Sequence, residues 1–273
     1  MNNIPVAKNE PILTYAPGSK EKLEVKKTLA ELRSKELEIT MIINGQPVKT
    51  NDRHRIHPPH DIQHTLGYYY KGGAKEIQMA IDAANAAKNK WENMAWQDRA
   101  AIFLKAADLI GGRYRARTNA MTMLGQSKNI YQAEIDAVCE FCDFLRFNVQ
   151  YLTQIYNIQP NSAQLIWNKL EYRPLEGFIF ALTPFNFTSI AGNLPCAPAL
   201  MGNTVVWKAS ETQIYSASLI MDILIESGLP PGVINLVFVD GATAGEVIFN
   251  HRDFGGIHFT GSTAVFRRIW ATI

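Results

Sequence analysis

The stretch GFIFALTPFNFTSIAGNLPCAPALMGNTVVWKAS, residues 177–210, decides the fold of this chain. Two short runs in it, GFIFALT and NTVVWKAS, are almost entirely apolar, as expected for strands that are covered on both faces of a sheet. The residues between them, TSIAGNLPCAPALM, predict a helix. A strand, a helix and a second strand with short connections predict two parallel strands joined by a right-handed crossover.

The same alternation continues along the rest of the chain. The helical pattern TQIYSASLIMDILIESG closes at Gly228, since glycine is a common residue just after a helix C-terminus. Two strands and two helices follow in alternation: VINLVFVD, TAGEVIFN, GIHFTGS and TAVFRRIWATI. The sequence therefore predicts an α/β fold, with a Rossmann-type parallel sheet over residues 175–273 and a helical N-terminal region before it.

Residues 1–73 predict an N-terminal helix and an extended segment. Ser19 is a suitable N-cap for a helix that runs to about Leu37. The Asn44-Gly45 pair in MIINGQPV predicts a tight hairpin.

Residues 74–157 predict the helical part of the same cofactor-binding unit. Helical patterns occur at 74–91 and 97–110, and a long helix then ends near Asn157. Residues 158–174 have Pro, Asn and Ser between apolar residues, and they predict an extended arm outside the main body.

Composition and charge exclude several classes of protein. The formal net charge is +2 and the basic residues form no stripe, so nothing predicts a nucleic acid or a membrane as partner. No apolar run approaches the roughly 20 residues that cross a bilayer, and the N-terminus resembles neither a secretory signal nor a transit peptide. We expect a cytoplasmic location, and the odd number of cysteines, 3, fits a reducing compartment.

Two clusters could suggest metal or redox chemistry, but the residues favour a structural interpretation of both, and no metal site is predicted. Cys139 and Cys142 form a C-x-x-C motif, yet apolar spacings of three and four from Ile135 to Tyr156 predict the buried face of one helix, with Cys142 on it. No second Cys or His pair stands at zinc-site spacing. Four histidines are interrupted by two prolines, which favours a surface loop. They are His54, His57, His60 and His64.

Ligands of an open parallel sheet bind outside the carboxyl ends of its strands, so the residues at these ends are candidates for a site. The FTGST turn opens a helix, whose free N–H groups and dipole could hold a phosphate. Taken singly, Gly261 is only a turn residue and Lys208 only a solvated strand end, and the chain has no G-x-G-x-x-G motif. The stronger argument is that the candidates share one edge: Thr183, Asn186, Lys208, Asp240, Gly241, Gly261 and Ser262.

The stretch PFNFTSIAGNLPCAPALMGNTVVWKAS, followed by FTGST, resembles the aldehyde dehydrogenase superfamily, whose members bind NAD(P) on a Rossmann-like domain without the glycine motif. The resemblance covers nearly the whole chain. Within the superfamily, the chain most resembles the branch that oxidises L-glutamate γ-semialdehyde to L-glutamate in proline catabolism. The stretches that carry it are NEPILTYAPGS, PPHDIQHTLGYYY, GQSKNIYQAEIDAVCEFCDFLRFN and LEGFIFALTPFNF. The resemblance implies NAD as cofactor, a small aldehyde as substrate, and a homo-oligomer for the full-length protein with residues 158–174 as oligomerisation arm.

The resemblance also implies roles for single residues. Asn186 matches the amide that stabilises the charged oxygen formed when a thiolate attacks the aldehyde, worth about 3–4 kcal/mol in comparable sites. Lys208 matches the lysine that reaches the adenosine ribose, and Glu211 lies near the same hydroxyls. An acid there accepts hydrogen bonds from the ribose and repels a 2′-phosphate, so NAD is expected rather than NADP. The other implied cofactor-binding residues are Thr183, Gly245, Gly261, Ser262, Thr263, Ala264 and Val265.

The nucleophilic cysteine and the glutamate of the family lie downstream of the FTGST turn, beyond Ile273. Cys139, Cys142 and Cys196 stand in apolar helical patterns with no activating partner in view, and they do not match the nucleophile. We therefore expect this chain to be the N-terminal, cofactor-binding portion of a longer enzyme, without its catalytic domain and inactive alone. Ala209 departs from the proline that is usual in the family.

Two alternatives stay open at the level of the sequence. One is a non-catalytic NAD-binding or assembly fragment, because the nucleophile and the general base are not among these residues. The other is a phosphorylating reductase of the same superfamily that uses NADPH, which Glu211 disfavours.

Overall fold

The structure is a computed structural model that describes residues 5–273, and it has the α/β fold predicted from the sequence. The N-terminal elements are α1 (Lys20–Arg33), β1 (Leu37–Ile39), β2 (Met41–Ile43), β3 (Gln46–Val48), β4 (Arg53–Ile56) and β5 (Gly67–Tyr70). The helical region contains α2 (Ala74–Glu92), α3 (Trp96–Gly111), α4 (Arg115–Gln126), α5 (Ile130–Ala133), the π-helix η1 (Glu134–Glu140) and α6 (Phe141–Tyr156). The last part contains β6 (Phe178–Leu182), α7 (Thr188–Leu200), β7 (Thr204–Lys208), the 3₁₀-helix η2 (Glu211–Gln213), α8 (Ile214–Ser227), β8 (Ile234–Val237), α9 (Gly241–Phe249), β9 (Phe254–Phe259) and α10 (Thr263–Thr272).

The larger sheet has six strands in the order β3-β2-β8-β7-β6-β9. Its strands β8, β7, β6 and β9 are parallel, as predicted. The chain adds β7 and β8 on one side of β6 and then returns to place β9 on the other side. In a doubly wound sheet the ligand crevice lies where the strand order reverses. In this sheet the reversal lies between β6 and β9.

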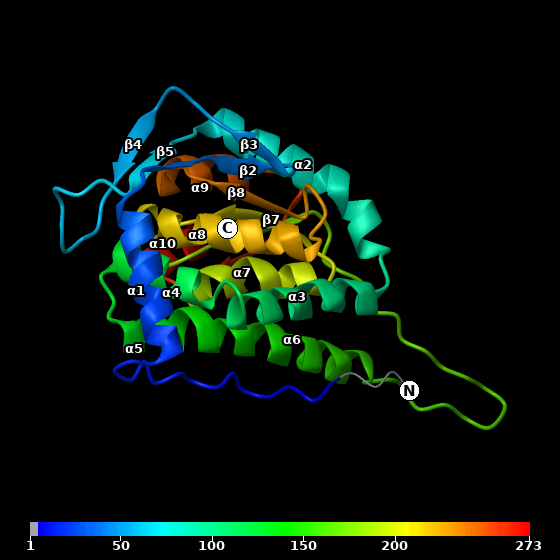
Figure 1. The fold of residues 1–273 in the computed structure, drawn as a ribbon. Helices are drawn as coiled ribbons and strands as arrows, with labels where there is room; N and C mark the ends of the chain where they lie inside the picture. The colour runs from blue at the N-terminus through cyan, green and yellow to red at the C-terminus, as the bar shows by residue number, and fades with distance from the viewer. Residues whose placement is uncertain (1–4) are drawn as a thin grey trace.

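Helices cover both faces of this sheet (Figure 1). α2 and α9 pack on one face, and α7 and α8 pack on the other, where α3 and α6 form an outer layer. Coverage on both faces explains why β6, β7 and β8 are buried along nearly all of their length. α7 also contacts α6 closely: a β-carbon on Gly192 would lie 2.2 Å from the Phe141 ring, so only glycine fits there.

β2 and β3 form the predicted hairpin. Asn44 and Gly45 have φ values of 51° and 70°, as a two-residue type I′ turn requires. The sequence did not predict that β2 also pairs antiparallel with β8, at Ile42 and Leu236. The Asn44 N–H donates a hydrogen bond to the Asn235 side chain at 2.9 Å, which fixes the turn to β8. The large sheet is therefore mixed rather than purely parallel.

The helix predicted after Ser19 starts at the expected residue, because the Ser19 hydroxyl accepts a hydrogen bond from the Lys22 N–H at 3.4 Å. Its predicted end near Leu37 is wrong, since α1 stops at Arg33. Leu37 lies instead in β1, where it pairs with Gly67.

A second sheet, with the strand order β1-β5-β4, was not predicted from the sequence. His54 lies in β4 and stacks on Tyr69 of β5, with ring centroids 5.3 Å apart. The prediction of a surface loop is therefore wrong for this histidine. In residues 5–273, no group of three or more His, Cys, Asp or Glu side chains could hold a metal ion.

Residues 158–174 form the extended arm expected from the sequence, without helix or strand (Figure 1). Leu165 is 100% exposed and Trp167 is 84% exposed. Contiguous apolar exposure of this kind marks interaction surfaces in many proteins, but the oligomerisation role of the arm stays a prediction. No helix within residues 5–273 is long and apolar enough to cross a membrane.

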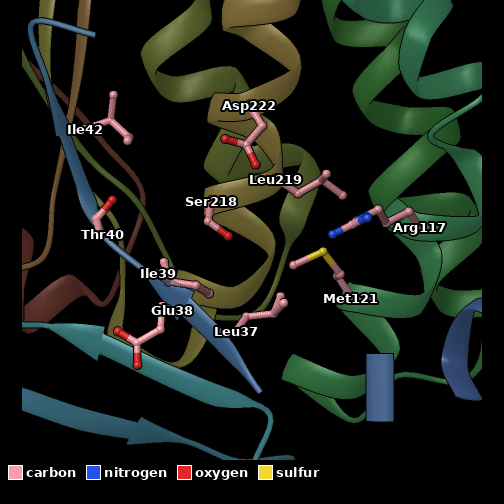
Figure 2. Close-up of a pocket in the computed structure, with 10 residues that line it drawn as sticks. All are labelled: Leu37, Glu38, Ile39, Thr40, Ile42, Arg117, Met121, Ser218, Leu219 and Asp222. Atoms are coloured by element: carbon pink, nitrogen blue, oxygen red, sulfur yellow. The ribbon is translucent and has the colours of Figure 1, made fainter. Parts of the chain in front are cut away.

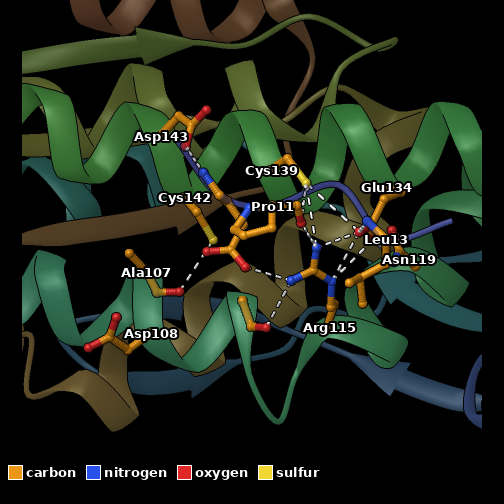
Figure 3. A network of polar contacts seen from close by, with 12 residues as sticks. Pro11, Leu13, Ala107, Asp108, Arg115, Asn119, Glu134, Cys139, Cys142 and Asp143 are labelled. Carbon is orange, nitrogen blue, oxygen red and sulfur yellow. Dashed lines mark hydrogen bonds and ion pairs between the residues drawn. The ribbon is translucent and has the colours of Figure 1, made fainter. Parts of the chain in front are cut away.

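A buried polar network ties the N-terminal segment to α4 and η1 (Figure 3). The Glu134 carboxylate accepts hydrogen bonds from the Leu13 N–H at 2.9 Å, the Tyr15 hydroxyl at 2.7 Å and the Asn119 side chain at 2.8 Å. Arg115 forms an ion pair with the same carboxylate. Burial by itself would raise the pKa of Glu134, but the hydrogen bonds from Arg115 and the other donors hold it below its ordinary value. Glu134 is therefore a buried, charged anchor for the segment that contains Leu13 and Tyr15.

Candidate active site

The carboxyl ends of the four parallel strands are level with one another. Leu182 of β6 pairs with Lys208 of β7 on one side and with Phe259 of β9 on the other. Lys208 in turn pairs with Val237 of β8. The residues that follow these positions therefore open on one edge of the sheet, as the sequence predicted.

Asn186 lies in the turn between β6 and α7, beside the reversal of strand order. It is exposed, and its neighbours Phe185 and Phe187 are 64% and 39% exposed. A side-chain amide at this place can donate a hydrogen bond to a ligand in the crevice. Its role as oxyanion donor stays a prediction.

A carboxylate that the sequence analysis did not single out holds the start of α7. Asp136 of η1 accepts hydrogen bonds from the N–H groups of Thr188 at 3.1 Å and Ser189 at 3.0 Å, and from the Ser189 hydroxyl at 2.8 Å. Lys128 pairs with Asp136 at 2.6 Å, and its Nζ lies 4.2 Å from the centroid of the Phe187 ring. The turn before α7 is thus fixed from the helical region.

Thr183 is buried just after β6, and its hydroxyl is engaged within the sheet edge. It accepts a hydrogen bond from the Trp207 indole N–H at 3.2 Å and donates one to the Lys208 carbonyl at 3.4 Å. Thr183 therefore helps to join β6 to β7. Its predicted place in the lining of a cofactor site stays a prediction.

Four charged side chains meet beyond the ends of β7 and β8. Burial lowers the pKa of Lys208, although the nearby carboxylates Glu211 and Asp240 oppose this effect. Lys71, which follows β5, lies 2.8 Å from Asp240 and 3.5 Å from Glu211. Lys71 could not be recognised from the sequence, because no local pattern shows that the small sheet reaches this edge.

The turn after β9 presents a helix N-terminus to the crevice. The Ser262 hydroxyl caps α10 by accepting a hydrogen bond from the Val265 N–H at 3.3 Å. The N–H groups of Thr263 and Ala264 belong to the first turn, where a helix has no internal acceptor for them. A β-carbon at Gly261 would lie 2.5 Å from the ring of Phe259, so a larger residue there would displace that ring. Residues 261–265 are exposed, and such a terminus suits a phosphate.

The donors and acceptors along this edge match the parts of a dinucleotide. A lysine and a carboxylate, Lys208 and Glu211, suit ribose hydroxyls, and the N-terminus of α10 suits a pyrophosphate. Gly245 lies on α9, where a β-carbon would approach the Phe249 ring to 3.2 Å. The helix surface therefore carries no side chain at this position. The residues present therefore fit a nicotinamide dinucleotide.

None of the three cysteines can serve as a nucleophile. Burial, followed by the charge of Glu134, raises the pKa of Cys139 to about 12. Burial also raises the pKa of Cys142, whose thiol donates a hydrogen bond to the Ala107 carbonyl at 3.3 Å, and of Cys196. A thiol with a raised pKa stays protonated at neutral pH and is inert.

A separate cavity of about 210 Å³ lies between β1, α4 and α8 (Figure 2). Arg117 and Asp222 are directed into it from the two helices. It contains none of the residues at the strand ends. The carboxyl edge of the sheet is therefore the better candidate for the active site.

Comparison with known proteins agrees with the fold described above. The family model described as "Aldehyde dehydrogenase family" matches residues 48–273. The chain therefore belongs to the aldehyde dehydrogenase family, and the resemblance seen in its motifs is confirmed.

Individual relatives match over almost the whole chain. Delta-1-pyrroline-5-carboxylate dehydrogenase of Agaricus bisporus is 49% identical over 272 residues, which are 99% of this chain and 50% of that protein. A mitochondrial enzyme of the same name from Dictyostelium discoideum is 43% identical over 270 residues, 98% of this chain and 48% of that protein. The crystal structure of the Mycobacterium tuberculosis enzyme bound with NAD superimposes with a TM-score of 0.98 at 48% identity, covering 100% of this chain and 51% of that one. The chain thus spans about half the length of the curated relatives it matches.

Proposed function

We propose that this chain binds NAD⁺ and forms the cofactor-binding part of an enzyme that oxidises L-glutamate γ-semialdehyde to L-glutamate. The observation that carries the proposal is the shared edge of the sheet: Asn186 follows β6 and the N-terminus of α10 follows the adjacent strand β9, while Lys208 ends β7 and Glu211 begins η2. The relatives named delta-1-pyrroline-5-carboxylate dehydrogenase and the NAD-bound neighbour support the substrate and the cofactor.

Each group of the edge has one task in this proposal. Lys208 and Glu211 hold the adenosine ribose, and the first turn of α10 holds the pyrophosphate. The bound dinucleotide supplies the hydride acceptor. The Asn186 amide donates a hydrogen bond to the aldehyde oxygen as negative charge develops on it. Asp136 fixes the start of α7, next to the turn that carries this amide, and so limits reorganisation of the turn during the reaction.

Replacing Lys208 by alanine is expected to weaken NAD⁺ binding about tenfold or more, because a hydrogen bond to a charged group contributes about 1.5–3 kcal/mol. Replacing Asn186 by alanine is expected to leave NAD⁺ affinity nearly unchanged, since its partner is the substrate oxygen. Isothermal titration calorimetry with NAD⁺ on both variants measures the two effects. Equal losses of affinity would show that the division of roles is wrong.

A non-catalytic NAD-binding or assembly role is the second candidate. It is favoured by the three buried thiols, none of which ionises at neutral pH. Both candidates predict that this chain alone releases no NADH from the semialdehyde and NAD⁺, so turnover by these 273 residues alone would reject the non-catalytic candidate. The homo-oligomer and the cytoplasmic location stay predictions, and sedimentation velocity and cell fractionation test them.

A further inference from the structure

The backbone at Lys71 is locked against the edge of the large sheet. The Lys71 N–H donates a hydrogen bond to the Asp52 carbonyl at 2.8 Å, and the Lys71 carbonyl accepts one from the Thr50 hydroxyl at 2.6 Å. The next N–H, of Gly72, donates to the carbonyl of Phe238, which follows β8, at 2.8 Å. The small sheet therefore delivers the Lys71 side chain to the adenosine end of the proposed cofactor site.

The Lys71 ammonium changes the charge balance at this place. Its Nζ lies 2.8 Å from the Asp240 carboxylate and 3.5 Å from the Glu211 carboxylate, and the lysine side chain is only 19% exposed. The charges of the same two carboxylates also act on Lys208, whose pKa they raise against the larger effect of burial. Two lysines and two acids give a local net charge of zero at neutral pH. Without Lys71, the same place would carry one net negative charge.

We propose that Lys71 is a specificity-determining residue for the dinucleotide, and that selectivity between NAD⁺ and NADP⁺ is set by the balance of Lys71 against Glu211 rather than by Glu211 alone. The proposal rests on the proposed function, in which Glu211 lies at the ribose hydroxyls. A 2′-phosphate placed there meets the Glu211 carboxylate and the Lys71 ammonium together. Lys71 therefore offsets part of the repulsion, and the chain discriminates only weakly against NADP⁺.

A purely structural ion pair is the competing explanation for Lys71. Glu211 and Asp240 are 54% and 58% exposed, and pairs of that exposure contribute about 0–1 kcal/mol to stability. A structural role predicts a change in stability without a change in the ratio of the two dissociation constants. A role in specificity predicts a change in the ratio of the two dissociation constants without a change in stability.

The test is isothermal titration calorimetry of the chain with NAD⁺ and with NADP⁺ at low ionic strength. Lys71→Met is expected to raise the Kd for NADP⁺ about tenfold and the Kd for NAD⁺ less than about twofold. Lys71→Arg keeps the charge and should retain the ratio of the native chain. Lys75→Met is the matched control, since this lysine is exposed at the start of α2, and it should change neither Kd.

A second probe protects the test against a variant that does not fold. Asp240→Asn removes the closer partner of Lys71 and leaves one net positive charge, so it is expected to tighten NADP⁺ binding severalfold and to leave NAD⁺ binding unchanged. Equal changes for the two dinucleotides in Lys71→Met, or no gain for NADP⁺ in Asp240→Asn, overturn the proposed role of Lys71. If the native chain binds neither dinucleotide, the proposed cofactor site fails and this inference fails with it.

Discussion

Replacing Arg115 by alanine is expected to lower the free energy of unfolding by about 3–5 kcal/mol, the largest loss that we expect from one substitution in this chain. The Glu134 side chain is 0% exposed, and that of Arg115 is 11% exposed. Removal of the guanidinium leaves a buried carboxylate without its charged partner, which costs more than the pair itself contributes. Arg115 also pairs with Glu10 at 2.6 Å and donates to the Pro11 carbonyl at 2.6 Å, so the N-terminal segment loses its anchor as well.

The pH dependence of this loss follows from the pKa of Glu134. Burial would raise that pKa in the folded chain, but hydrogen bonds, first from Arg115, hold it below its ordinary value. A carboxyl with a depressed folded pKa stabilises the fold above its unfolded pKa of about 4.3, and it loses that contribution as the pH falls through the folded pKa. In Arg115→Ala, burial raises the pKa of Glu134 because its charged partner is gone. Glu134 therefore takes up a proton as the pH falls, and the variant no longer holds an unpaired buried charge. The difference between the two proteins should be widest at neutral pH and narrow as the pH falls toward about 4.

Urea unfolding followed by circular dichroism measures the loss at each pH. Arg173→Ala is the matched control, because the Arg173 and Glu176 side chains are 78% and 77% exposed, and such pairs contribute about 0–1 kcal/mol. If Arg115→Ala loses no more stability than this control, the buried network does not anchor the N-terminal segment.

The parallel strands could be predicted because each carries its own signal. β6, β7 and β8 are continuous apolar runs between turn residues, which is the pattern of strands buried on both faces. The small sheet gives no such signal. Arg53–Ile56 is largely charged and Gly67–Tyr70 is short and aromatic. The two become strands only by pairing with one another, and Gly67–Tyr70 also pairs with β1. The division of the chain into four segments stays a prediction.

Candidate site residues could be predicted where they lie at the end of a strand or in the turn after it, as Asn186, Lys208 and Ser262 do. Lys71 could not be found in this way, because only the pairing of distant segments brings it to Asp240 and Glu211. The hydrophobic periodicity of the neighbouring sequence does not show where tertiary contacts will place a side chain.

Asp136 was hidden by a change of helix type. In an α-helix, successive residues point about 100° away from one another, so an apolar stripe that contains Ile135 leaves its two acidic neighbours off the stripe. The π-helix η1 instead buries both acids, with Glu134 at 0% and Asp136 at 2% exposure, while Ile135 is only half-buried. The prediction of one regular helix from Ile135 onward is therefore wrong at its start. π-helical turns are rare and occur often at functional sites, which fits the contact of Asp136 with α7.

Replacing Asp136 by alanine is expected to lower the free energy of unfolding by about 3 kcal/mol, because two costs combine. The N–H groups of Thr188 and Ser189 lose their acceptor at the start of α7, and a lost N-terminal cap costs about 0.5–2 kcal/mol. Lys128, whose side chain is 16% exposed, loses a carboxylate at 2.6 Å, and an uncompensated buried charge is costly. The same change should release the turn that carries Asn186, so amide hydrogen exchange at Thr188 and Ser189 should become faster.

Two variants separate the cap from the charge. Asp136→Asn keeps one oxygen as acceptor but no charge, so we expect a loss between those of the native chain and Asp136→Ala. Asp108→Ala is the matched control, since its side chain is 78% exposed and 3.4 Å from Arg146, and it should cost at most about 1 kcal/mol. Native exchange rates at Thr188 and Ser189 in Asp136→Ala would show that Asp136 does not hold the start of α7. Faster exchange confined to this turn, with α3 and α8 still protected, would instead show that the π-helix fixes the position of Asn186 and does more than contribute to global stability.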